Sequence, residues 1–385
     1  MKEHYMSKTG KLVRMRATRV VLFVLLATAC LWVGVCCIVP SSMKQVKAPR
    51  GGRAYNNRVA IVYSKHYQMS LGGLERLHSF DIRKYARIYL KLNTEGFLRP
   101  EDVFVPEAVT ENEILLVHTP EFLESLKDSP TVAKYLEAPF AAVMPNALVD
   151  AALLNAFRHA TGGTVLASRL ALKHGIAINI GGGYHHAKPY QGEGFCVYAD
   201  MPIAIRVLQK EKLIGRAMVI DLDVHQGNGT AVCFATDDSA FTFSMHQGNI
   251  YPIPKATSDL DIELKAGTND EQFLSILDKN LGRAIDLANP DIIFLQAGCD
   301  TLKGDPLANL NMSLEGIVKR DAMVIDECVK RRIPIVMTLG GGYSKRAWEV
   351  QYASIARTLK KYGITGSSQP HDRRELTGKE KLYTK

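Results

Sequence analysis

Short apolar runs recur along the chain from residue 58 onward, and most of them end in a cluster of Gly, Asp or His. Apolar runs of about five residues are typical of strands buried on both faces of a parallel sheet. The predicted strands cover 59–63, 176–180, 218–222, 241–245, 292–296 and 335–339.

Segments with helical spacing of apolar residues separate these runs. The predicted helices cover 74–92, 110–126 with a break near Pro120, 164–174, 202–210, 270–288, 313–331 and 345–361. Alternating strands and helices predict an α/β fold with a central, mostly parallel sheet and helices on both faces. Ligands of such sheets bind beyond the carboxyl ends of the strands, where the polar clusters of this chain also lie.

The run at 218–222 leads into Asp221, Asp223 and His225, and then breaks in a Gly-Asn-Gly turn. Buried carboxylates are costly unless something compensates their charge. Residues i and i+2 of a strand share a face, so Asp223 and His225 can point at one centre. Carboxylate and imidazole together suit a divalent metal such as zinc. Asp300, after another strand, would complete a three-ligand shell; the alternative is that Asp300 caps a following helix or loop.

Two adjacent histidines, His185 and His186, follow three glycines at the end of the strand at 176–180. Such a pair suits general acid–base work on a metal-bound water, with a surface pair as the alternative. Asp221 could orient one ring, and Asn228 could hold the other through a neutral hydrogen bond. Tyr343, in a second Gly-Gly-Gly-Tyr sequence, is a candidate hydroxyl donor to an oxyanion, although a tyrosine in such a loop is more often structural.

The net charge of +9 is concentrated at the N-terminus. Residues 1–58 hold eleven Lys or Arg and one acidic residue, whereas the rest of the chain holds 37 basic and 38 acidic residues. A near-neutral body argues against direct nucleic-acid binding. The seven cysteines show no C-x-x-C spacing, which argues against a disulfide framework and against a cysteine-ligated zinc.

The chain divides into five parts by composition. Residues 20–40 are uncharged and end at Pro40, which is long enough to cross the hydrocarbon core of a membrane. We expect a single-pass membrane anchor there, with a cleaved signal as the alternative; basic residues on both sides leave the orientation open. The predicted parts are a basic flank at 1–19, the anchor at 20–40, a linker at 41–57, a catalytic domain at 58–362 and a polar tail at 363–385.

The motifs of the body resemble the zinc-dependent histone deacetylase family over roughly 58–362. The shared motifs are Gly-Gly-Gly-Tyr-His185-His186, Gly194-Phe-Cys196, Asp221-Leu-Asp223-Val-His225-Gln-Gly-Asn228-Gly, Ala-Gly-Cys-Asp300 with Gly304-Asp305, and Gly-Gly-Gly-Tyr343. Other segments look like class IV members of that family, among them Gly72-Leu74-Glu75-Leu77-His78, Pro145-Asn146, Thr161-Gly-Gly163 and Gly-Ile-Val-Lys-Arg320-Asp.

The resemblance implies an arginase–deacetylase fold and the hydrolysis of an acyl-lysine amide at a zinc ion. By position, His186 would be the general base, and His185 with Asp221 would act as general acid or electrostatic partner. The other implied roles are zinc ligation by Asp223, His225 and Asp300, oxyanion donation by Tyr343, positioning by Asn228, substrate binding by Phe195, Tyr251 and Gly341, and a structural potassium held by Asp221, Ser244 and the backbone of Asp223, His225 and Met245.

Class IV resemblance further implies removal of long fatty acyl chains from protein lysines in preference to acetyl. Two alternatives are a small-molecule amide hydrolase of the acetylpolyamine type and an inactive relative that binds acyl groups. An intact set of candidate residues argues against the inactive relative. The membrane would be a partner through the N-terminal segment.

Overall fold

The computed structural model describes residues 58–69, 73 and 78–363. The predictions for the basic flank, the anchor and the linker lie outside the described residues, as does all but the first residue of the predicted tail. Among the residues described, no helix has the length and apolar character needed to cross a membrane.

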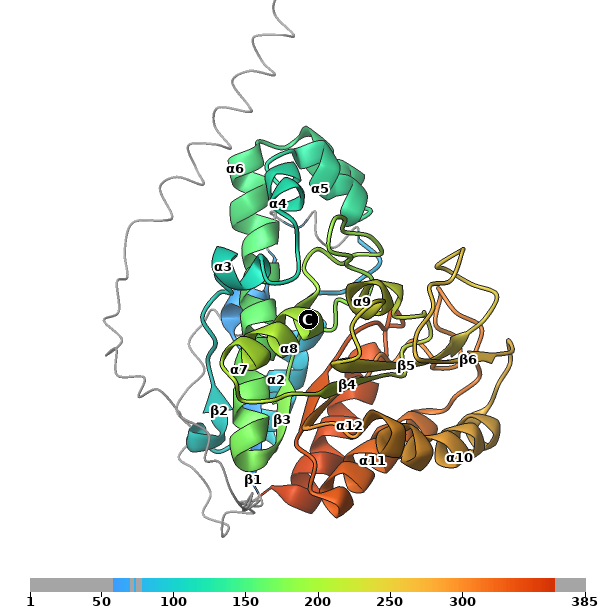
Figure 1. Ribbon diagram of the computed structural model, residues 1–385. Coiled ribbons are helices and arrows are strands. Elements are labelled where there is room, and N and C mark those ends of the chain that lie inside the picture. The colour runs from blue at the N-terminus through green and yellow to red at the C-terminus, as the bar shows by residue number, and fades with distance from the viewer. Residues whose placement is uncertain (1–57, 70–72, 74–77, 364–385) are drawn as a thin grey trace, which may run out of the picture. The chain divides into compact units, whose positions relative to one another are not determined.

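The described residues form one open sheet of eight strands, all of them parallel to their neighbours (Figure 1). The order across the sheet is β2-β1-β3-β8-β7-β4-β5-β6. The strands are β1 (Arg58–Val62), β2 (Val103–Phe104), β3 (Gly175–Asn179), β4 (Ala217–Asp221), β5 (Ala240–Gln247), β6 (Leu260–Leu264), β7 (Ile292–Gln296) and β8 (Ile335–Thr338). The predicted parallel α/β sheet is therefore confirmed.

Strand β8 is the last strand in the chain, yet it lies in the middle of the sheet. It pairs with β3 on one side, with Ile335 opposite Ile176, and with β7 on the other. The strands β3, β8, β7 and β4 are thus consecutive across the sheet, and their carboxyl ends form one continuous edge.

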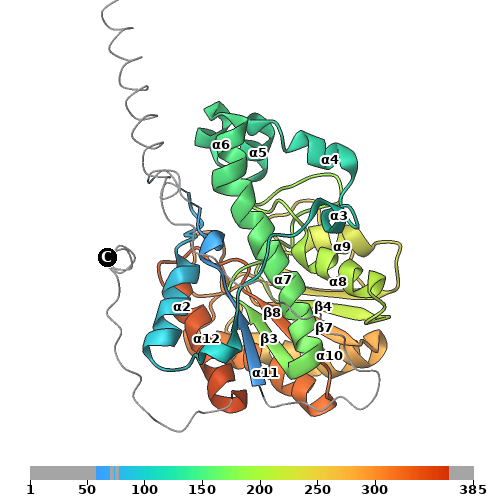
Figure 2. The same ribbon diagram turned by 90° about the vertical axis from the view of Figure 1, so that its left-hand side faces the viewer.

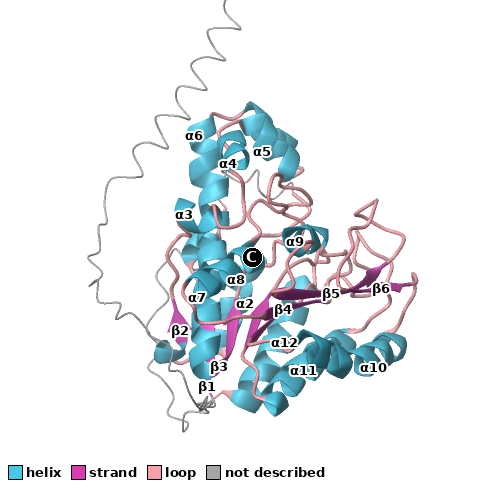
Figure 3. Cartoon of the chain, in the orientation of Figure 1, coloured by secondary structure: helices cyan, strands magenta, loops and turns pink. Residues whose placement is uncertain are grey.

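Helices cover both faces of the sheet, as Figures 1 and 2 show and Figure 3 outlines by element type. Helix α7 packs on β1, β3 and β8 and against α8, whereas α10, α11 and α12 follow one another on the opposite face, with α2 beside α12. The longer helices are α2 (Lys84–Thr94), α7 (Asn155–His174), α8 (Asp200–Lys210), α10 (Asp270–Ala288), α11 (Leu314–Arg331) and α12 (Ala347–Tyr362). The short ones are α3 (Glu111–Ile114), α4 (Pro120–Ser125), α5 (Ser129–Tyr135), α6 (Asn146–Val149) and α9 (Asn228–Phe234).

Helices on both faces leave the central strands without a solvent-facing side. Every residue of β3, β4, β7 and β8 is buried, and the runs are rich in Ile and Val. Burial on both faces explains why the strands appear in the sequence as continuous apolar runs, without the alternation of a half-exposed strand.

The predicted boundaries of two helices are wrong. The helix predicted over 74–92 begins only at Lys84, because Asp81 accepts hydrogen bonds from the Arg83 backbone and side chain and forms a turn before it; residues 74–77 of that prediction are not described. The helix predicted to begin at residue 164 begins at Asn155, although Gly162 and Gly163 lie inside it.

Other local predictions hold. Thr110 and Glu113 form the predicted capping box, and the chain breaks before Pro120, where α4 begins. Helix α7 ends at His174 because Gly175 adopts a positive φ of 96°. The strands β2 and β6 were not predicted, since β2 has two residues and β6 is mostly half-exposed.

Candidate active site

Most of the candidate residues lie on the four loops that leave the central strands; the exceptions are Asp221 at the end of β4, Asn228 at the start of α9 and Tyr251 after β5. The loop after β3 carries the histidine pair, the loop after β4 carries Asp223 and His225, and the loops after β7 and β8 carry Asp300 and Tyr343. Because β3, β8, β7 and β4 are adjacent, these loops meet at one edge of the sheet. Residues up to 158 positions apart in the sequence, from His185 to Tyr343, are thereby brought to one place.

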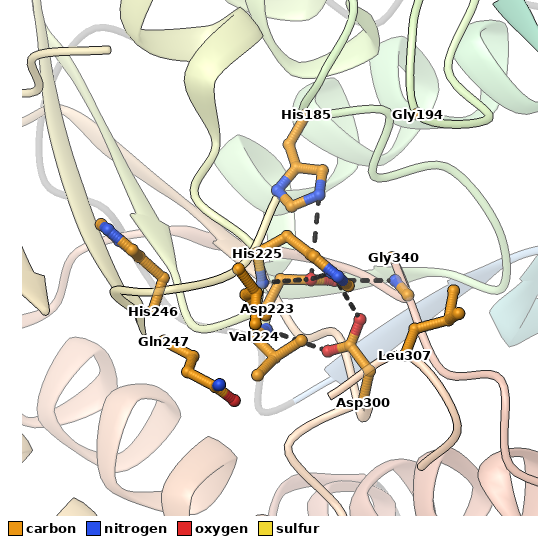
Figure 4. Close-up of polar contacts among 12 residues, drawn as sticks. His185, Gly194, Asp223, Val224, His225, His246, Gln247, Asp300, Leu307 and Gly340 are labelled. Atoms are coloured by element: carbon orange, nitrogen blue, oxygen red, sulfur yellow. Dashed lines mark hydrogen bonds and ion pairs between the residues drawn. The ribbon is translucent and has the colours of Figure 1, made fainter. Parts of the chain in front are cut away.

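Asp223, His225 and Asp300 form one buried cluster, in which the potential ligand atoms all lie within 4.8 Å of one another. The Nδ1 atom of His225 is 3.2 Å from Asp223 Oδ1 and 3.2 Å from Asp300 Oδ2. Figure 4 shows the three side chains pointing toward one another, with His185 on one side of them. Asp223 and His225 converge as predicted, but not because they share one face of a strand. Strand β4 ends at Asp221, and both residues lie on the loop beyond it.

Backbone N–H groups fix the outer carboxylate oxygens of this cluster. Gly341 N donates to Asp223 Oδ2 at 2.9 Å, and Val224 N donates to Asp300 Oδ1 at 2.9 Å. The alternative role of Asp300 as a helix cap is not seen, because its oxygens face Val224 and His225. A Cβ on Gly298 would overlap the Asp223 carboxylate, so a glycine is needed at this point of closest approach.

The charges of the cluster suit a cation. Burial and the neighbouring Asp223 carboxylate raise the pKa of Asp300 to about 7. Two buried carboxylates side by side repel each other, and a divalent cation bound between them would remove that repulsion. Two carboxylates and one imidazole are a donor set that zinc accepts, and they leave a further coordination position free for water or substrate.

The two histidines have different partners. His185 Nδ1 is 2.7 Å from Asp221 Oδ2, whereas His186 Nδ1 is 2.6 Å from Asn228 Oδ1. Burial lowers the pKa of His185, but Asp221 and Asp223 outweigh it and raise that pKa to about 9. Burial and the neighbouring imidazoles of His185 and His225 hold the pKa of His186 well below 6.5. One ring therefore favours the cation and the other the neutral base.

Tyr343, Phe195 and Tyr251 surround the histidines and the cluster. The ring centroid of Tyr343 is 6.3 Å from that of His225 and 5.8 Å from that of Phe195. Tyr251 lies 5.0 Å from the His186 ring and is 40% exposed, so it lies at the rim of the site. The structure thus brings together all the sequence-predicted site residues.

A pocket adjoins this group and is lined by His185, His186, Phe195, Gly341 and Tyr343. The rest of its wall is largely apolar and comes from the turn before α2, from the 136–140 segment, from the segment just before α7 and from the first turn of α7. These apolar residues are Phe80, Ile82, Leu136, Phe140, Leu153 and Phe157. The cavity therefore continues from the polar centre into an apolar space.

Sequence reasoning assigned no role to two residues that hold the loop after β8. Lys84 is buried, and its Nζ donates to the carbonyl oxygens of Gly340 and Gly341 at 2.9 and 3.4 Å. Asp305 Oδ2 accepts the backbone N–H of Tyr343 and Ser344 at 2.8 and 3.0 Å. The signal that could have identified Lys84 is its position on the apolar face of the predicted helix, four residues before Ile88.

A third missed residue is Glu193, which hydrogen-bonds Asn228 from the loop after β3. Its signal was a lone acid between two glycines, directly before Gly194-Phe195. The predicted potassium site stays a prediction: the Ser244 hydroxyl hydrogen-bonds His246 Nδ1 at 2.9 Å, and Asp221 faces His185.

Comparisons with known proteins show which family has a similar sequence and fold. A family model described as the histone deacetylase domain matches residues 78–359. Histone deacetylase 2 of Arabidopsis thaliana is 38% identical over 311 residues, 80% of this chain and 80% of that protein. Acetoin utilization protein AcuC of Staphylococcus aureus is 26% identical over 332 residues, 78% of this chain and 82% of that protein. The crystal structure of the HDA15 HD domain superposes with a TM-score of 0.64 at 20% identity, covering 80% of this chain and 90% of that chain.

The chain belongs to the histone deacetylase family. It has the arginase–deacetylase type of α/β fold and is an amidohydrolase of that family. The predicted family and fold are therefore confirmed.

Proposed function

We propose that the protein is a zinc-dependent lysine deacylase that removes acyl groups, preferably long fatty acyl chains, from protein lysines. The observation that carries the proposal is the buried cluster of Asp223, His225 and Asp300 beside two histidines with opposite charge preferences. The class IV motifs named above support the assignment to that subclass.

The residues divide the work of amide hydrolysis. Asp223, His225 and Asp300 would hold the zinc ion, which when bound supplies a Lewis acid for the substrate carbonyl and for water. His186, neutral and with Nδ1 hydrogen-bonded to Asn228, presents Nε2 as the atom that accepts a proton from water. His185, paired with Asp221, stays positively charged beside it and stabilises negative charge. Tyr343 donates its hydroxyl to the oxyanion, and Phe195 lines the path of the lysine side chain.

The apolar part of the cavity supports a preference for long acyl chains. Each CH₂ group moved from water into an apolar space gains about 0.8 kcal/mol, so two such groups change affinity about tenfold. Leu153 and Phe157, one α-helical turn apart in sequence, both line this space. Leu153 belongs to a π-helical segment, Asp150–Leu154, between α6 and α7, and π turns are frequent at functional sites.

A small-molecule amide hydrolase is the second candidate. The same cluster and histidines would serve a free acylated amine, and the similarity to AcuC, named for acetoin utilization, gives this candidate its support. It predicts cleavage of acetylpolyamines with no preference for peptides.

The first test compares one lysine peptide in acetylated and myristoylated form, and acetylspermidine, with and without a zinc chelator. Chelator-sensitive cleavage that favours the myristoyl peptide is the expected result. Cleavage of acetylspermidine alone would replace the proposal by the second candidate, and activity that a chelator leaves unchanged would refute the zinc assignment.

A further inference from the structure

Glu193 lies at the centre of a hydrogen-bond network behind the proposed base. Its Oε1 accepts from Asn228 Nδ2 at 2.5 Å, and its Oε2 accepts from Lys188 Nζ at 2.9 Å and from Gln191 Nε2 at 3.1 Å. The Tyr251 hydroxyl is a further hydrogen-bond partner of this carboxylate. All of these partners can donate, and a carboxylate can only accept, so each of these bonds has one possible direction.

The direction of these bonds matters because Asn228 carries an acceptor on one side of its amide and a donor on the other. An amide that rotates by 180° would turn its NH₂ toward His186 and would hydrogen-bond the opposite tautomer of that ring. With Glu193 accepting the NH₂, Oδ1 remains 2.6 Å from His186 Nδ1, which must then carry the proton. The Nε2 atom of His186 is left with its lone pair, as a base requires.

We propose that Glu193 is a positioning residue that fixes the tautomer of His186 through Asn228. The inference rests on the proposed function, because it assigns a partner to the proposed base. A neutral amide alone can hydrogen-bond either tautomer of His186. The hydrogen-bond chain from His186 through Asn228 to Glu193 ends in a carboxylate, which can only accept, so it selects one tautomer.

The loop that carries Glu193 is built to hold it in place. Isolated bridges join Lys188 to Gln191 and Glu193 to Cys196, and Gly194 and Phe195 follow with positive φ angles of 55° and 65°. A positive φ at a phenylalanine is uncommon and persists only where the surroundings fix the backbone. A Cβ on Gly194 would contact the His186 ring, so the loop packs directly on the base that it orients.

The substitution Glu193→Gln tests the direction of the bonds with little change of shape. Because Lys188 and Gln191 both donate, the oxygen of the new amide will turn toward them and its NH₂ toward Asn228. The Asn228 amide must then rotate, and His186 receives the wrong tautomer. We expect kcat for an acyl-lysine peptide to fall by about 10- to 100-fold, with KM changed less than about threefold.

A second substitution should restore what the first removes. In Asn228→Asp, two carboxylates face each other, and we expect kcat to fall as well. In the double variant Glu193→Gln with Asn228→Asp, the new carboxylate at position 228 can accept from both His186 and the new amide at position 193, so most of the lost turnover should return. The proposal is overturned if Glu193→Gln keeps kcat within about twofold, or if the double variant is no faster than the slower single variant.

Glu327→Gln is the matched control. Glu327 on α11 has the same side-chain exposure as Glu193, 19%, and is likewise ion-paired, to Lys330 and Arg331. It should leave kcat unchanged. Zinc content should stay constant in all variants, which separates an effect on the base from a loss of metal.

A readout that needs no substrate separates this inference from the proposed function. Long-range ¹H–¹⁵N spectra of protein labelled with ¹⁵N-histidine report which ring nitrogen is protonated, and a His186→Ala variant identifies the signal. We expect the proton on Nδ1 in the native protein and on Nε2 in Glu193→Gln. The same tautomer in both would refute the role of Glu193, even if the native protein proved inactive on every acyl-lysine peptide.

Discussion

His185 and His186 are adjacent in the sequence and buried side by side, with ring centroids 4.0 Å apart, yet their environments differ in charge. The difference comes from the carboxylates of Asp221 and Asp223 beside His185, whereas His186 faces the neutral amide of Asn228 and two neighbouring imidazoles. At the residue scale, the protonation of the two rings therefore depends on the groups that surround them. Substitutions at different residues of the site should have different effects on turnover and on metal binding.

Tyr343→Phe should reduce turnover while zinc stays bound. The ring lies among Phe80, Phe195 and His225 and can keep its packing, so the loss is confined to the hydroxyl and its hydrogen bond to an oxyanion. Removal of one such donor typically costs about 10²- to 10³-fold in kcat. Steady-state kinetics and metal analysis of the same sample measure both; loss of zinc would contradict the oxyanion role.

Asp300→Ala should instead lose the metal. One of three ligands disappears, and Asp223 and His225 alone form a poor site. Metal analysis after dialysis is expected to show zinc well below one equivalent, with turnover near background. An unchanged zinc content would show that Asp300 is not a ligand.

At the scale of elements, the fit between α7 and the sheet depends on a glycine that has no role in chemistry. Gly163 lies in the middle of α7, where a Cβ would overlap the Tyr67 hydroxyl and the Asn179 side chain. Tyr67 in turn donates to Asn179 Oδ1 at 2.8 Å, at the end of β3. The helix can approach the strand that carries the histidine loop because this position has no side chain.

We predict opposite effects for the same change in two helices. Gly163→Ala should lower the free energy of unfolding by about 1–3 kcal/mol, because overpacking outweighs helix propensity. Gly282→Ala in α10 should raise it by up to about 1 kcal/mol, since a Cβ there meets nothing closer than an Arg331 nitrogen at 3.4 Å. Urea unfolding measures both; stabilisation by Gly163→Ala would show that the contact with Tyr67 yields easily.

Several elements and most of the site could be predicted from the sequence because their signals are local. The strand that ends at Asp221 is an uninterrupted apolar run, and the candidate ligands stand directly after such runs. Lys84 and Glu193 were missed because their roles depend on contacts with residues distant in the sequence. Lys84 contacts Gly340, 256 positions away, and Glu193 contacts Asn228, 35 positions away. The predicted start of α7 is too late because Gly162 and Gly163, which are poor helix formers, lie in the middle of the helix, where close packing leaves no room for a side chain at either position.

At the scale of the whole molecule, buried histidines make stability depend on pH. His118 joins two segments, because Ala199 N donates to its Nε2 at 2.9 Å and its Nδ1 lies 3.3 Å from the Pro189 carbonyl oxygen. Burial lowers the pKa of His118 from its ordinary 6.5 to about 4. Between these values the unfolded chain binds a proton that the folded chain does not, so stability falls as the pH falls from 6.5 toward 4.

This single group should contribute a loss of up to about 3 kcal/mol in the free energy of unfolding between pH 6.5 and 4. His118→Gln removes the titration, and we expect its urea midpoint to be lower at pH 7 but to change less on acidification. Unfolding at about pH 7, 6 and 5 tests this. An equal slope in both proteins would show that other groups account for the acid sensitivity.

The position of β8 also has a consequence for how the chain folds during its synthesis on the ribosome. Until residues 335–338 have been made, the chain lacks the strand that joins β2-β1-β3 to β7-β4-β5-β6. The loops that carry the histidines and those that carry the aspartates then belong to different halves. We therefore expect the ligand cluster and the histidines to meet only when almost all of the described chain has been synthesised, at about 5–20 residues per second. The sheet and the candidate active site should thus be completed together, when the last strand is inserted.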